Sequence, residues 1–144
     1  MDINVLEGFP RTEIEIRCAE NSDEVQKIVA AIRGCEKKLS GFKDGAAHLI
    51  EPGDVLYFES VDGRCFAYTA RDAFEIPLRL YEAENLLADA NFFRSAKSQI
   101  VNIAQIESLC PDFGGRMEVR LKNGERLIVS RQYAKILKER MRLK

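Results

Sequence analysis

The pattern of apolar and polar residues changes once along the chain. Residues 13–18 alternate polar and apolar side chains with a period of two, which predicts a half-buried strand. Residues 1–6 are its expected hairpin partner across a turn at Gly8-Phe9-Pro10. After Asn21, the expected N-cap with Glu24 three residues later, apolar residues recur at helical spacing and predict a helix over residues 22–39.

From about residue 47 the pattern becomes one of short strands separated by turn residues. We expect strands near residues 47–50, 55–59, 64–69, 72–76, 92–96, 106–109, 117–122 and 125–129. Turns are expected at Pro52-Gly53-Asp54 and Asp62-Gly63, and Asn123-Gly124 predicts a type I′ hairpin turn. Helices are expected over 78–87 and, after Ser130 as N-cap, over 131–142. The fold class is therefore α+β and predominantly β.

The first 40 residues have two interpretations. Four apolar residues of the first helix form a stripe that a stable helix must bury: Val25, Ile28, Val29 and Ile32. Either this strand-helix extension caps the rest of the chain, or the stripe is a dimerisation surface. A shift in composition near residues 41–46 predicts the division into an N-terminal extension, residues 1–44, and a main domain, residues 45–144.

The distribution of charge is more informative than its sum. The net charge of the whole chain is −1. Residues 1–93 carry 10 Lys and Arg against 18 Asp and Glu, whereas residues 94–144 carry 12 against 5. The C-terminal part thus has a net charge of +7 beside a remainder at −8. Because polyanions respond to the local field, this asymmetry is compatible with nucleic-acid binding.

Several classes of protein lack support in the sequence. Neither a membrane span nor a secretory signal is readable, so a cytoplasmic location is expected. His48 is the only histidine, and paired carboxylates and a Gly-rich phosphate loop are missing. We therefore predict no catalytic residue, no metal, no cofactor and no small-molecule substrate, and hence no enzyme. The four cysteines are widely spaced and are expected to be mainly buried hydrophobes, with a regulatory thiol pair as the alternative: Cys18, Cys35, Cys65 and Cys110.

Two stripes of side chains run along the expected closing helix. The apolar stripe consists of Tyr133, Ile136, Leu137 and Met141. The basic stripe consists of Arg131, Lys135, Lys138 and Arg142. Such a charged stripe is usually a solvated face. Here the preceding hairpin adds further cations with few acids between them, which favours phosphate contacts: Arg116, Arg120, Lys122 and Arg126.

The stretch from residue 92 to residue 102 combines core residues with hydrogen-bond donors. Phe92, Ile100 and Val101 are expected in the core, with Phe93 on the opposite face of the strand. Three polar side chains are then left projecting, and they can bind phosphate oxygens or guanine acceptors: Arg94, Lys97 and Ser98. Asn102 is expected to be a turn or backbone-capping amide.

The order of these motifs resembles the LytTR DNA-binding domain family. The matching residues are Tyr57-Phe58-Glu59-Ser60, Phe93-Arg94, Lys97-Ser98, Ile100-Val101-Asn102, Ile106, Leu121, Asn123-Gly124, Val129-Ser130-Arg131, Tyr133 and Leu137-Lys138. They cover roughly residues 45–144. The resemblance implies a LytTR-like fold of small antiparallel sheets with short helices, which reads successive major grooves through loops. Such domains serve as bacterial transcription factors, often binding direct repeats as two protomers and bending the DNA.

The resemblance also implies positions of contact. Arg94, Lys97 and Ser98 fall on the first DNA-contacting loop. The start of the last helix supplies Gln132 and Lys135 beside Arg131, with Lys138 further along the basic stripe, and Arg64 lies near a third contact region. Ala96 stands where the family often carries His, and Gln132 where a second Arg is common, so the base preference is expected to differ from the usual site.

The leading hypothesis is a sequence-specific, double-stranded DNA-binding bacterial transcriptional regulator. It is expected to act as a homodimer on direct-repeat promoter sites. About 45 residues precede the domain, too few for a doubly wound receiver domain, so the chain resembles the stand-alone type. Stand-alone members are often encoded beside membrane proteins, so a membrane-protein partner encoded nearby is expected. The alternative is a protein-interaction module, with an acidic docking N-terminal part and a non-functional basic face.

Overall fold

The computed structural model describes residues 1–36, 38–88 and 90–141, without the side chains of residues 34–36. Its helices are α1 (Asp23–Glu36), α2 (Leu80–Leu86) and α3 (Arg131–Arg140). Its strands are β1 (Leu39–Lys43), β2 (Ala46–Ile50), β3 (Val55–Val61), β4 (Arg64–Thr69), β5 (Ala73–Ile76), β6 (Phe92–Ala96), β7 (Gln99–Asn102), β8 (Ile106–Pro111), β9 (Met117–Leu121) and β10 (Arg126–Val129). Three 3₁₀ turns connect strands: η1 (Pro52–Asp54), η2 (Ile103–Gln105) and η3 (Phe113–Gly115).

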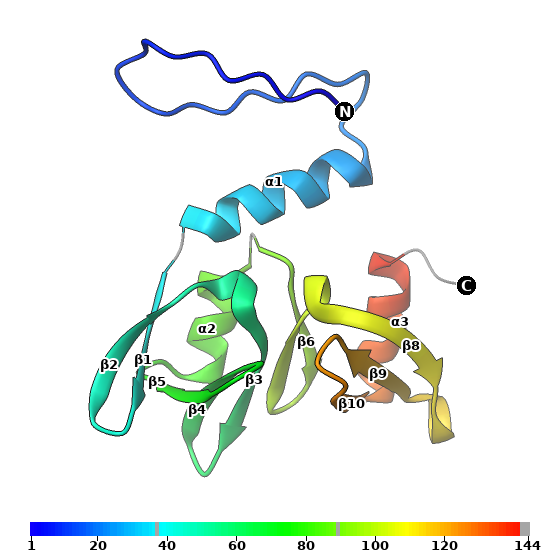
Figure 1. Cartoon of the computed structure of the whole chain (residues 1–144). Coiled ribbons are helices and arrows are strands. Elements are labelled where there is room, and N and C mark those ends of the chain that lie inside the picture. Colours follow the sequence, from blue (N-terminus) through cyan, green and yellow to red (C-terminus); the bar gives the residue numbers. More distant parts are fainter. Residues whose placement is uncertain (37, 89, 142–144) are drawn as a thin grey trace.

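The strands form two antiparallel sheets. The larger sheet has seven strands in the order β2-β1-β5-β4-β3-β7-β6, and the smaller has three in the order β10-β9-β8. Figure 1 shows α2 beside the larger sheet on one side of β6, with the smaller sheet and α3 on the other side. The predicted α+β, predominantly β architecture of small antiparallel sheets with short helices is confirmed.

Strands β6 and β7 separate two hydrophobic cores. Phe92 and Ile100 belong to a core that the larger sheet forms with α2. Phe93 and Val101 belong to a second core, formed with the smaller sheet and α3. Successive side chains of a strand point to opposite faces, so pairs of consecutive apolar residues are what a strand covered on both faces requires. The four predicted core positions are therefore confirmed.

Strand β3 is also buried on both faces, with an irregularity. The register with β4 shifts between Val55 and Tyr57. Such a bulge interrupts the alternation of side chains. Leu56 and Tyr57 both enter the second core, whereas Val55 and Phe58 enter the first. The continuous apolar run in the sequence thus supplies both cores from one strand.

The hairpin turns follow the local sequence in one case and depart from it in another. Asp62 and Gly63, with φ of 51° and 78°, form the tight turn between β3 and β4. Positive φ at both central residues is the mark of a type I′ turn. At Asn123-Gly124 the hairpin is confirmed but the type I′ turn is wrong, because Asn123 lacks a positive φ and Gly124 has φ of 93°. The Gly124 N–H donates to the Leu121 carbonyl at 2.9 Å, which makes a three-residue loop.

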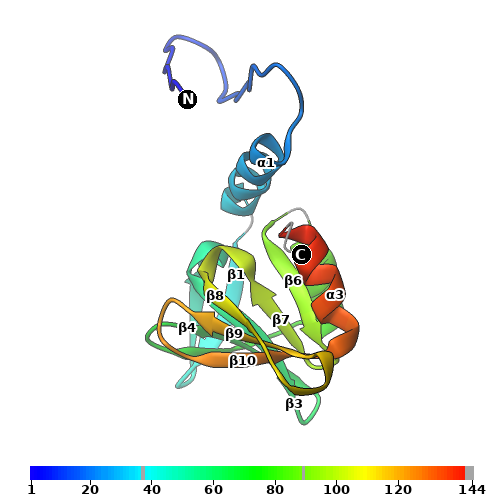
Figure 2. The same cartoon turned by 90° about the vertical axis from the view of Figure 1, so that its right-hand side faces the viewer.

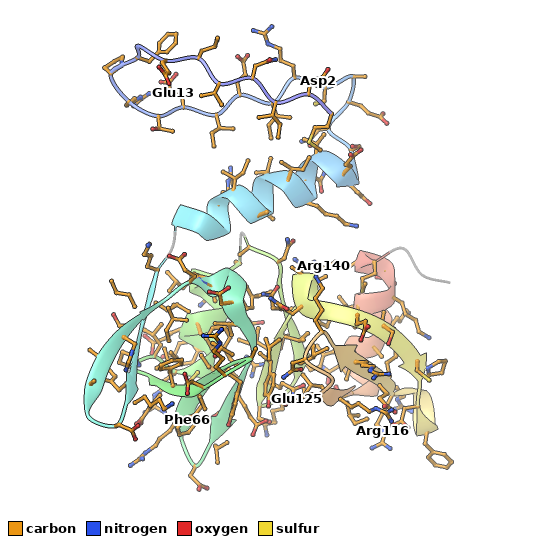
Figure 3. The ribbon with its side chains drawn as sticks, in the orientation of Figure 1. Asp2, Glu13, Phe66, Arg116, Glu125 and Arg140 are labelled. Carbon is orange, nitrogen blue, oxygen red and sulfur yellow. The ribbon has the colours of Figure 1, made fainter. Side chains whose placement is uncertain are left out.

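The N-terminal segment departs most from its prediction. Residues 1–22 contain no strand, so the expected hairpin between residues 1–6 and 13–18 is wrong. In Figure 3, Asp2 and Glu13 lie on a loop well apart from both sheets. An isolated two-stranded hairpin is at best marginally stable in water, and this segment has no sheet beside it to extend.

The helix that follows is confirmed, with adjusted ends. Its N-cap is Ser22 and not Asn21, because the Ser22 Oγ accepts the Val25 N–H at 3.4 Å. The helix ends at Glu36, and Leu39, expected to be helical, begins β1 and packs into the first core. The apolar stripe of α1 is only half-buried. Figure 2 shows α1 at the end of the molecule opposite to the β3–β4 turn.

Strand β1 was not predicted from the sequence, because its central residue is Gly41 and glycine is unusual inside a strand. A Cβ at this position would lie 2.4 Å from Ile50 Cδ1 and 2.7 Å from Phe74 Cβ, so only glycine fits between these side chains. β1 precedes residue 45, yet it is hydrogen-bonded between β2 and β5. Strand β7 was likewise not predicted as separate from β6. Among the described helices, none has the length and apolarity needed to cross a membrane.

Candidate nucleic-acid interface

Three segments far apart in the sequence meet at one end of the molecule, opposite to α1. They are the β3–β4 turn, the β6–β7 turn and the start of α3 (Figures 1 and 2). The Ser60 N–H donates to the Ser98 carbonyl at 2.8 Å, which joins the first two segments. The Ser130 N–H donates to the Ser95 carbonyl at 3.1 Å, which joins the third segment to β6. Backbone bonds therefore fix the relative positions of all three.

The β6–β7 turn presents Lys97 and Ser98 to solvent. Both residues are exposed, while Ala96 is half-buried. The pairing of β6 with β7 shifts register between Arg94 and Ala96, so Ser95 forms a bulge directly before the turn. The Ser95 hydroxyl is buried and lies 3.0 Å from Gln99 Oε1, to which it donates. The bulge and this bond set the direction in which Lys97 leaves the sheet.

Arg94 does not project freely from this turn. Its side chain is 21% exposed, and Nη1 lies 3.1 Å from Glu84 Oε1 on α2. Its Nε donates to the Ala96 carbonyl at 2.9 Å, and Nη2 donates to the Lys97 carbonyl. The expectation that Arg94 projects with Lys97 is wrong, because the guanidinium folds back and holds the turn.

Helix α3 begins with three exposed polar side chains, Arg131, Gln132 and Lys135. Ser130 stands at the N-cap as predicted, although its hydroxyl makes no capping bond. Lys138 is half-buried, and Arg142 lies outside the described residues. The basic stripe of α3 is thus most accessible in its first two turns.

The buried face of α3 differs from the predicted stripe at one position. Ala134 and Leu137 are buried in the second core, and Tyr133 and Met141 pack against it. Ile136 is 47% exposed, so its predicted burial is wrong. With 3.6 residues per turn, the face that carries Ala134 and Leu137 turns Ile136 toward solvent beside Gln132.

The third predicted contact region carries Arg64. This residue begins β4 directly after the Asp62-Gly63 turn, and its side chain is 68% exposed. Its Nε lies 3.6 Å from Glu75 Oε1 on the neighbouring strand β5. An exposed pair of this kind contributes little to stability, so the guanidinium can exchange its partner for a ligand at small cost.

The arginines of the small sheet are balanced by acids. Arg116 Nη2 lies 3.2 Å from Asp112 Oδ2, and Arg126 Nε lies 3.3 Å from Glu118 Oε1. Arg120 Nε lies 3.6 Å from Glu107. The sequence has few acids between these cations, but the fold brings acids beside them: Glu107 and Glu118 lie on neighbouring strands, and Asp112 lies four residues before Arg116. These pairs are exposed, as the Arg64 pair is, so they neutralise the arginines only in part. At the joined end, by contrast, the described residues place no acid within ion-pair distance of Lys97, Arg131 or Lys135.

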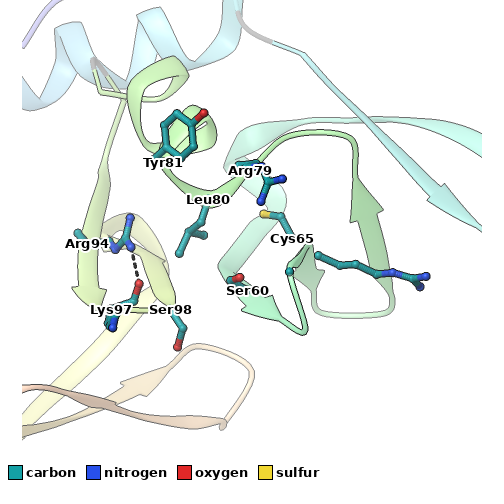
Figure 4. Close-up of a pocket in the computed structure, with 10 residues that line it drawn as sticks. Ser60, Cys65, Arg79, Leu80, Tyr81, Arg94, Lys97 and Ser98 are labelled. Carbon is teal, nitrogen blue, oxygen red and sulfur yellow. Dashed lines mark hydrogen bonds between the residues drawn. The ribbon is translucent and has the colours of Figure 1, made fainter.

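A shallow hollow of about 420 Å³ lies between the β3–β4 turn, the start of α2 and the β6–β7 turn (Figure 4). Its lining includes Ser60, Arg64, Arg79, Arg94, Lys97 and Ser98. Sequence reasoning missed Arg79 and Ser60. The available signal was the residue type at the start of α2, because Arg79 occupies an N-cap position where Ser, Thr, Asp or Asn is preferred.

Asn102 is structural, as predicted. The side chain is 2% exposed, and its Nδ2 donates to the Val55 carbonyl at 2.9 Å. Its Oδ1 accepts the Ala104 N–H at 3.0 Å. Both ends of the amide are therefore used within the protein, as expected of a backbone-capping side chain.

The cysteines divide by exposure. Cys65 is buried beside the hollow, and burial raises the pKa of its thiol to about 11. Cys18 and Cys110 are exposed, so their predicted burial is wrong, and the side chain of Cys35 lies outside the described residues. Cys18 is the last residue of the predicted strand that did not form, and Cys110 lies on the solvent face of β8. Across the described residues, no cluster of three His, Cys, Asp or Glu is placed to hold a metal ion.

Comparison with known proteins gives a consistent result. The family model of the LytTr DNA-binding domain matches residues 45–142. HTH-type transcriptional regulators of Staphylococcus aureus strains MSSA476 and MW2, themselves uncharacterized, are each 34% identical over 145 residues, covering 98% of this chain and 98% of the relative. A solved LytTr DNA-binding domain from Bacillus cereus superposes with a TM-score of 0.68 and 25% identity, covering 72% of this chain and 95% of that one.

The architecture distinguishes this chain from a helix-turn-helix protein, whatever the name of its relatives. Strands separate α1 from α2 and α2 from α3, so the described residues contain no two consecutive helices joined by a short turn. The polar side chains at the joined end come from two hairpin turns and one helix start. This face thus presents two hairpin turns and a helix start, and not a helix-turn-helix pair.

Proposed function

Since the chain belongs to the family of LytTr DNA-binding domains, we propose that it is a bacterial transcriptional regulator that recognises a specific sequence of double-stranded DNA. The observation that carries this proposal is the hydrogen-bonded junction of the two hairpin turns with the start of α3. Sequence is read where side-chain donors reach base edges, and phosphate contacts set their register. Three segments held in fixed relation supply both kinds of contact.

The exposed residues of these segments divide by chemistry. Lys97 and Ser98 at the tip of the β6–β7 turn suit the acceptors of guanine or phosphate. Gln132, on the first turn of α3, has an amide that suits the donor and acceptor edge of adenine. Arg131, Lys135 and Arg64 supply phosphate contacts. Lys138, half-buried further along α3, adds mainly to the local field, and Arg94 acts by holding the turn.

We further propose that two protomers bind a direct repeat. In this proposal the loop and α1 of the predicted extension, residues 1–44, serve for pairing. Strand β1, although it precedes residue 45, belongs with residues 45–144 to the DNA-binding domain. Two features support the extension's role: the stripe of α1 is half-buried, and six large apolar residues before it are exposed, namely Met1, Ile3, Val5, Leu6, Phe9 and Ile14. A second copy of the same segment would cover both.

The proposed setting follows from the proposed function. A regulator of promoters works beside the chromosome, which places it in the bacterial cytoplasm. The acidic N-terminal part and its exposed apolar residues offer a binding surface for a membrane-protein partner encoded nearby. Co-expression with the membrane proteins of its own gene neighbourhood, followed by affinity purification, tests that partnership.

Selection from a pool of random DNA duplexes tests the function directly. The wild-type protein should enrich one motif, present as two copies in the same orientation at a fixed spacing. Lys97→Ala and Gln132→Ala should each weaken preference at one position of the motif by about 1–3 kcal/mol. Arg126→Ala removes the same kind of charge from the balanced small sheet and should leave the motif unchanged. Failure of the wild type to enrich any motif contradicts the proposal.

A protein-interaction module is the second candidate, and the exposed apolar residues of the N-terminal segment favour it. Sedimentation of the wild type, of Ile28→Asp and of Glu24→Asp as a conservative control distinguishes a protein-interaction module from a regulator that pairs through its extension. A dimer that Ile28→Asp converts to a monomer supports pairing through the extension. A monomeric wild type that enriches no DNA motif and co-purifies a protein partner supports the module.

A further inference from the structure

The hollow beside the two hairpin turns has a lining with cations and no acids. Of the residues that line it, Arg64, Arg79, Arg94 and Lys97 are positively charged, and none is Asp or Glu. The hydroxyls of Ser60 and Ser98 add two neutral donors, and Leu80 contributes an apolar wall. Figure 4 shows Arg79 on one side of the hollow, with Lys97 and Ser98 on the other.

The four cations differ in how far they are already neutralised. Arg94 is paired with Glu84, and Arg64 lies 3.6 Å from Glu75. For Arg79 and Lys97, the described part of the chain supplies no carboxylate within ion-pair distance. Two cations from different segments thus reach one hollow without a counter-charge among the described residues. The backbone bond between Ser60 and Ser98 fixes two of the segments that line it.

Arginine is also an unfavourable residue type at the N-cap of a helix, which is the position of Arg79. It is the N-cap residue of α2, with extended φ and ψ of −78° and 159°. Its own N–H donates to Glu82 Oε1 at 3.0 Å, which is one half of a capping box. Arginine has no side-chain oxygen to complete the other half. Residues that break a local rule tend to lie at functional sites, and here the side chain faces the hollow.

We propose that this hollow seats a backbone phosphate of bound DNA, held by Arg79 and Lys97 across from each other, with Ser60 and Ser98 as neutral donors. The inference rests on the proposed function and adds Arg79 to its contacts. A duplex is favoured over a free phosphate because the hollow adjoins the β6–β7 turn, whose tip carries Lys97 and Ser98. A volume of about 420 Å³ exceeds that of one phosphate group, which leaves space for the adjoining sugars.

A scan with neutral phosphates tests the proposal at atomic resolution. Each phosphate of the duplex selected by the wild type is replaced in turn by methylphosphonate, and affinity is measured by fluorescence anisotropy. The wild type should lose about tenfold in affinity at one phosphate, and Arg79→Gln should lose less than about twofold at that same phosphate. Arg79→Gln should also reduce the slope of log affinity against log salt by about one.

Two variants serve as controls. Arg79→Lys keeps the charge and should keep most of the slope. Arg71→Gln removes an exposed arginine between β4 and β5, at the other end of β4 from Arg64, and should bind like the wild type. Circular dichroism of each variant establishes that it is folded before binding is compared.

The remaining outcomes decide against the proposal. Equal losses in wild type and Arg79→Gln at every phosphate overturn it while leaving sequence-specific binding intact. Inorganic phosphate alone is titrated against the free protein by NMR; saturation below about 1 mM, together with a flat methylphosphonate scan, assigns the hollow to a free anion instead. If the wild type binds no duplex, both the proposed function and this inference are contradicted.

Discussion

Asn102 shows how one buried side chain sets the geometry of a neighbouring segment. Its amide donates to the Val55 carbonyl and accepts the Ala104 N–H, so it joins the end of β7 to the start of β3 and to η2. These partners are backbone groups that a differently shaped side chain would leave without a hydrogen bond. An amide is required because one end must donate and the other accept.

Replacing Asn102 should therefore cost more than replacing an exposed asparagine. We expect Asn102→Ala to lower the free energy of unfolding by about 1–3 kcal/mol, because the buried Val55 carbonyl and the part-buried Ala104 N–H lose their partner. Asn85→Ala, at an exposed position of α2, should change it by less than about 0.5 kcal/mol. Urea denaturation of the three proteins measures both values. Equal midpoints for the two variants would contradict the structural role of Asn102.

Replacing Arg79, unlike replacing Asn102, should raise stability while it weakens DNA binding. Arg79→Ser completes the capping box with Glu82 and should raise the free energy of unfolding by about 0.5–1 kcal/mol. The same change removes a cation from the hollow and should weaken DNA binding severalfold. Thermal unfolding and anisotropy on one preparation measure the two effects. A variant that is more stable and binds DNA as well as the wild type does would show that Arg79 has no part in binding.

The β6–β7 hairpin illustrates the difference between a contact and its support. Lys97 stands at the tip, where the described residues place no acid within ion-pair distance, whereas Arg94 folds back on the turn and is partly neutralised by Glu84. The two residues are three positions apart in sequence, so only the structure separates their roles. Loss of either should weaken DNA binding, for different physical reasons.

The salt dependence of binding distinguishes these reasons. Lys97→Ala should lower the slope of log affinity against log salt by about one, because one phosphate or base contact by a cation is lost. Arg94→Met keeps the apolar stem but removes the bonds that hold the turn, so affinity should fall with a smaller change in slope. Hydrogen exchange at the Ser60 amide, which donates to the Ser98 carbonyl of this turn, should accelerate in Arg94→Met. Unchanged exchange together with a slope change of one would make Arg94 a direct contact.

Elements were predictable where local sequence and tertiary context agree. The Asp62-Gly63 turn and the consecutive apolar pairs of β6 and β7 have local signals that packing reinforces. Residues 13–18 carry an equally clear alternation but lie beside no sheet, so the strand did not form. β1 was hidden because Gly41 serves a close approach to Phe74 that sequence does not reveal.

The charged surface of the whole molecule was predictable in its sign and not in its detail. The excess of cations after residue 93 is a property of the sequence. Which of them remain fully charged depends on the acids beside them in the fold, and Asp112, Glu107 and Glu118 each partly neutralise one arginine. Arg79 was missed because it belongs to the acidic part of the chain and reaches the basic end only through the fold.

The two cores also make the molecule sensitive to alkaline pH. Burial is the main cause that raises the pKa of Cys65, to about 11, and it likewise raises the pKa of Tyr57 and Tyr68. Tyr57 additionally donates a hydrogen bond of 2.9 Å to Glu125, which lies in the loop between β9 and β10 and is labelled in Figure 3. These groups keep their protons in the folded state at a pH where the unfolded chain has released them.

The sign of the effect follows from this difference. Above pH 9 the unfolded chain binds fewer protons than the folded protein, so the free energy of unfolding falls as pH rises. The stabilisation is fully present below pH 9, and the part due to Cys65 is lost between pH 9 and about 11. The two tyrosines extend this loss of stability to pH values above 10, which is their ordinary pKa.

Two substitutions separate these contributions. Cys65→Ala should remove the first part of the decline in the free energy of unfolding, and Tyr57→Phe should remove the second part. Urea denaturation from pH 8 to 11 measures both. Tyr81→Phe, at an exposed tyrosine, is the matched control; a decline of the same steepness in all four proteins would show that neither core group is responsible.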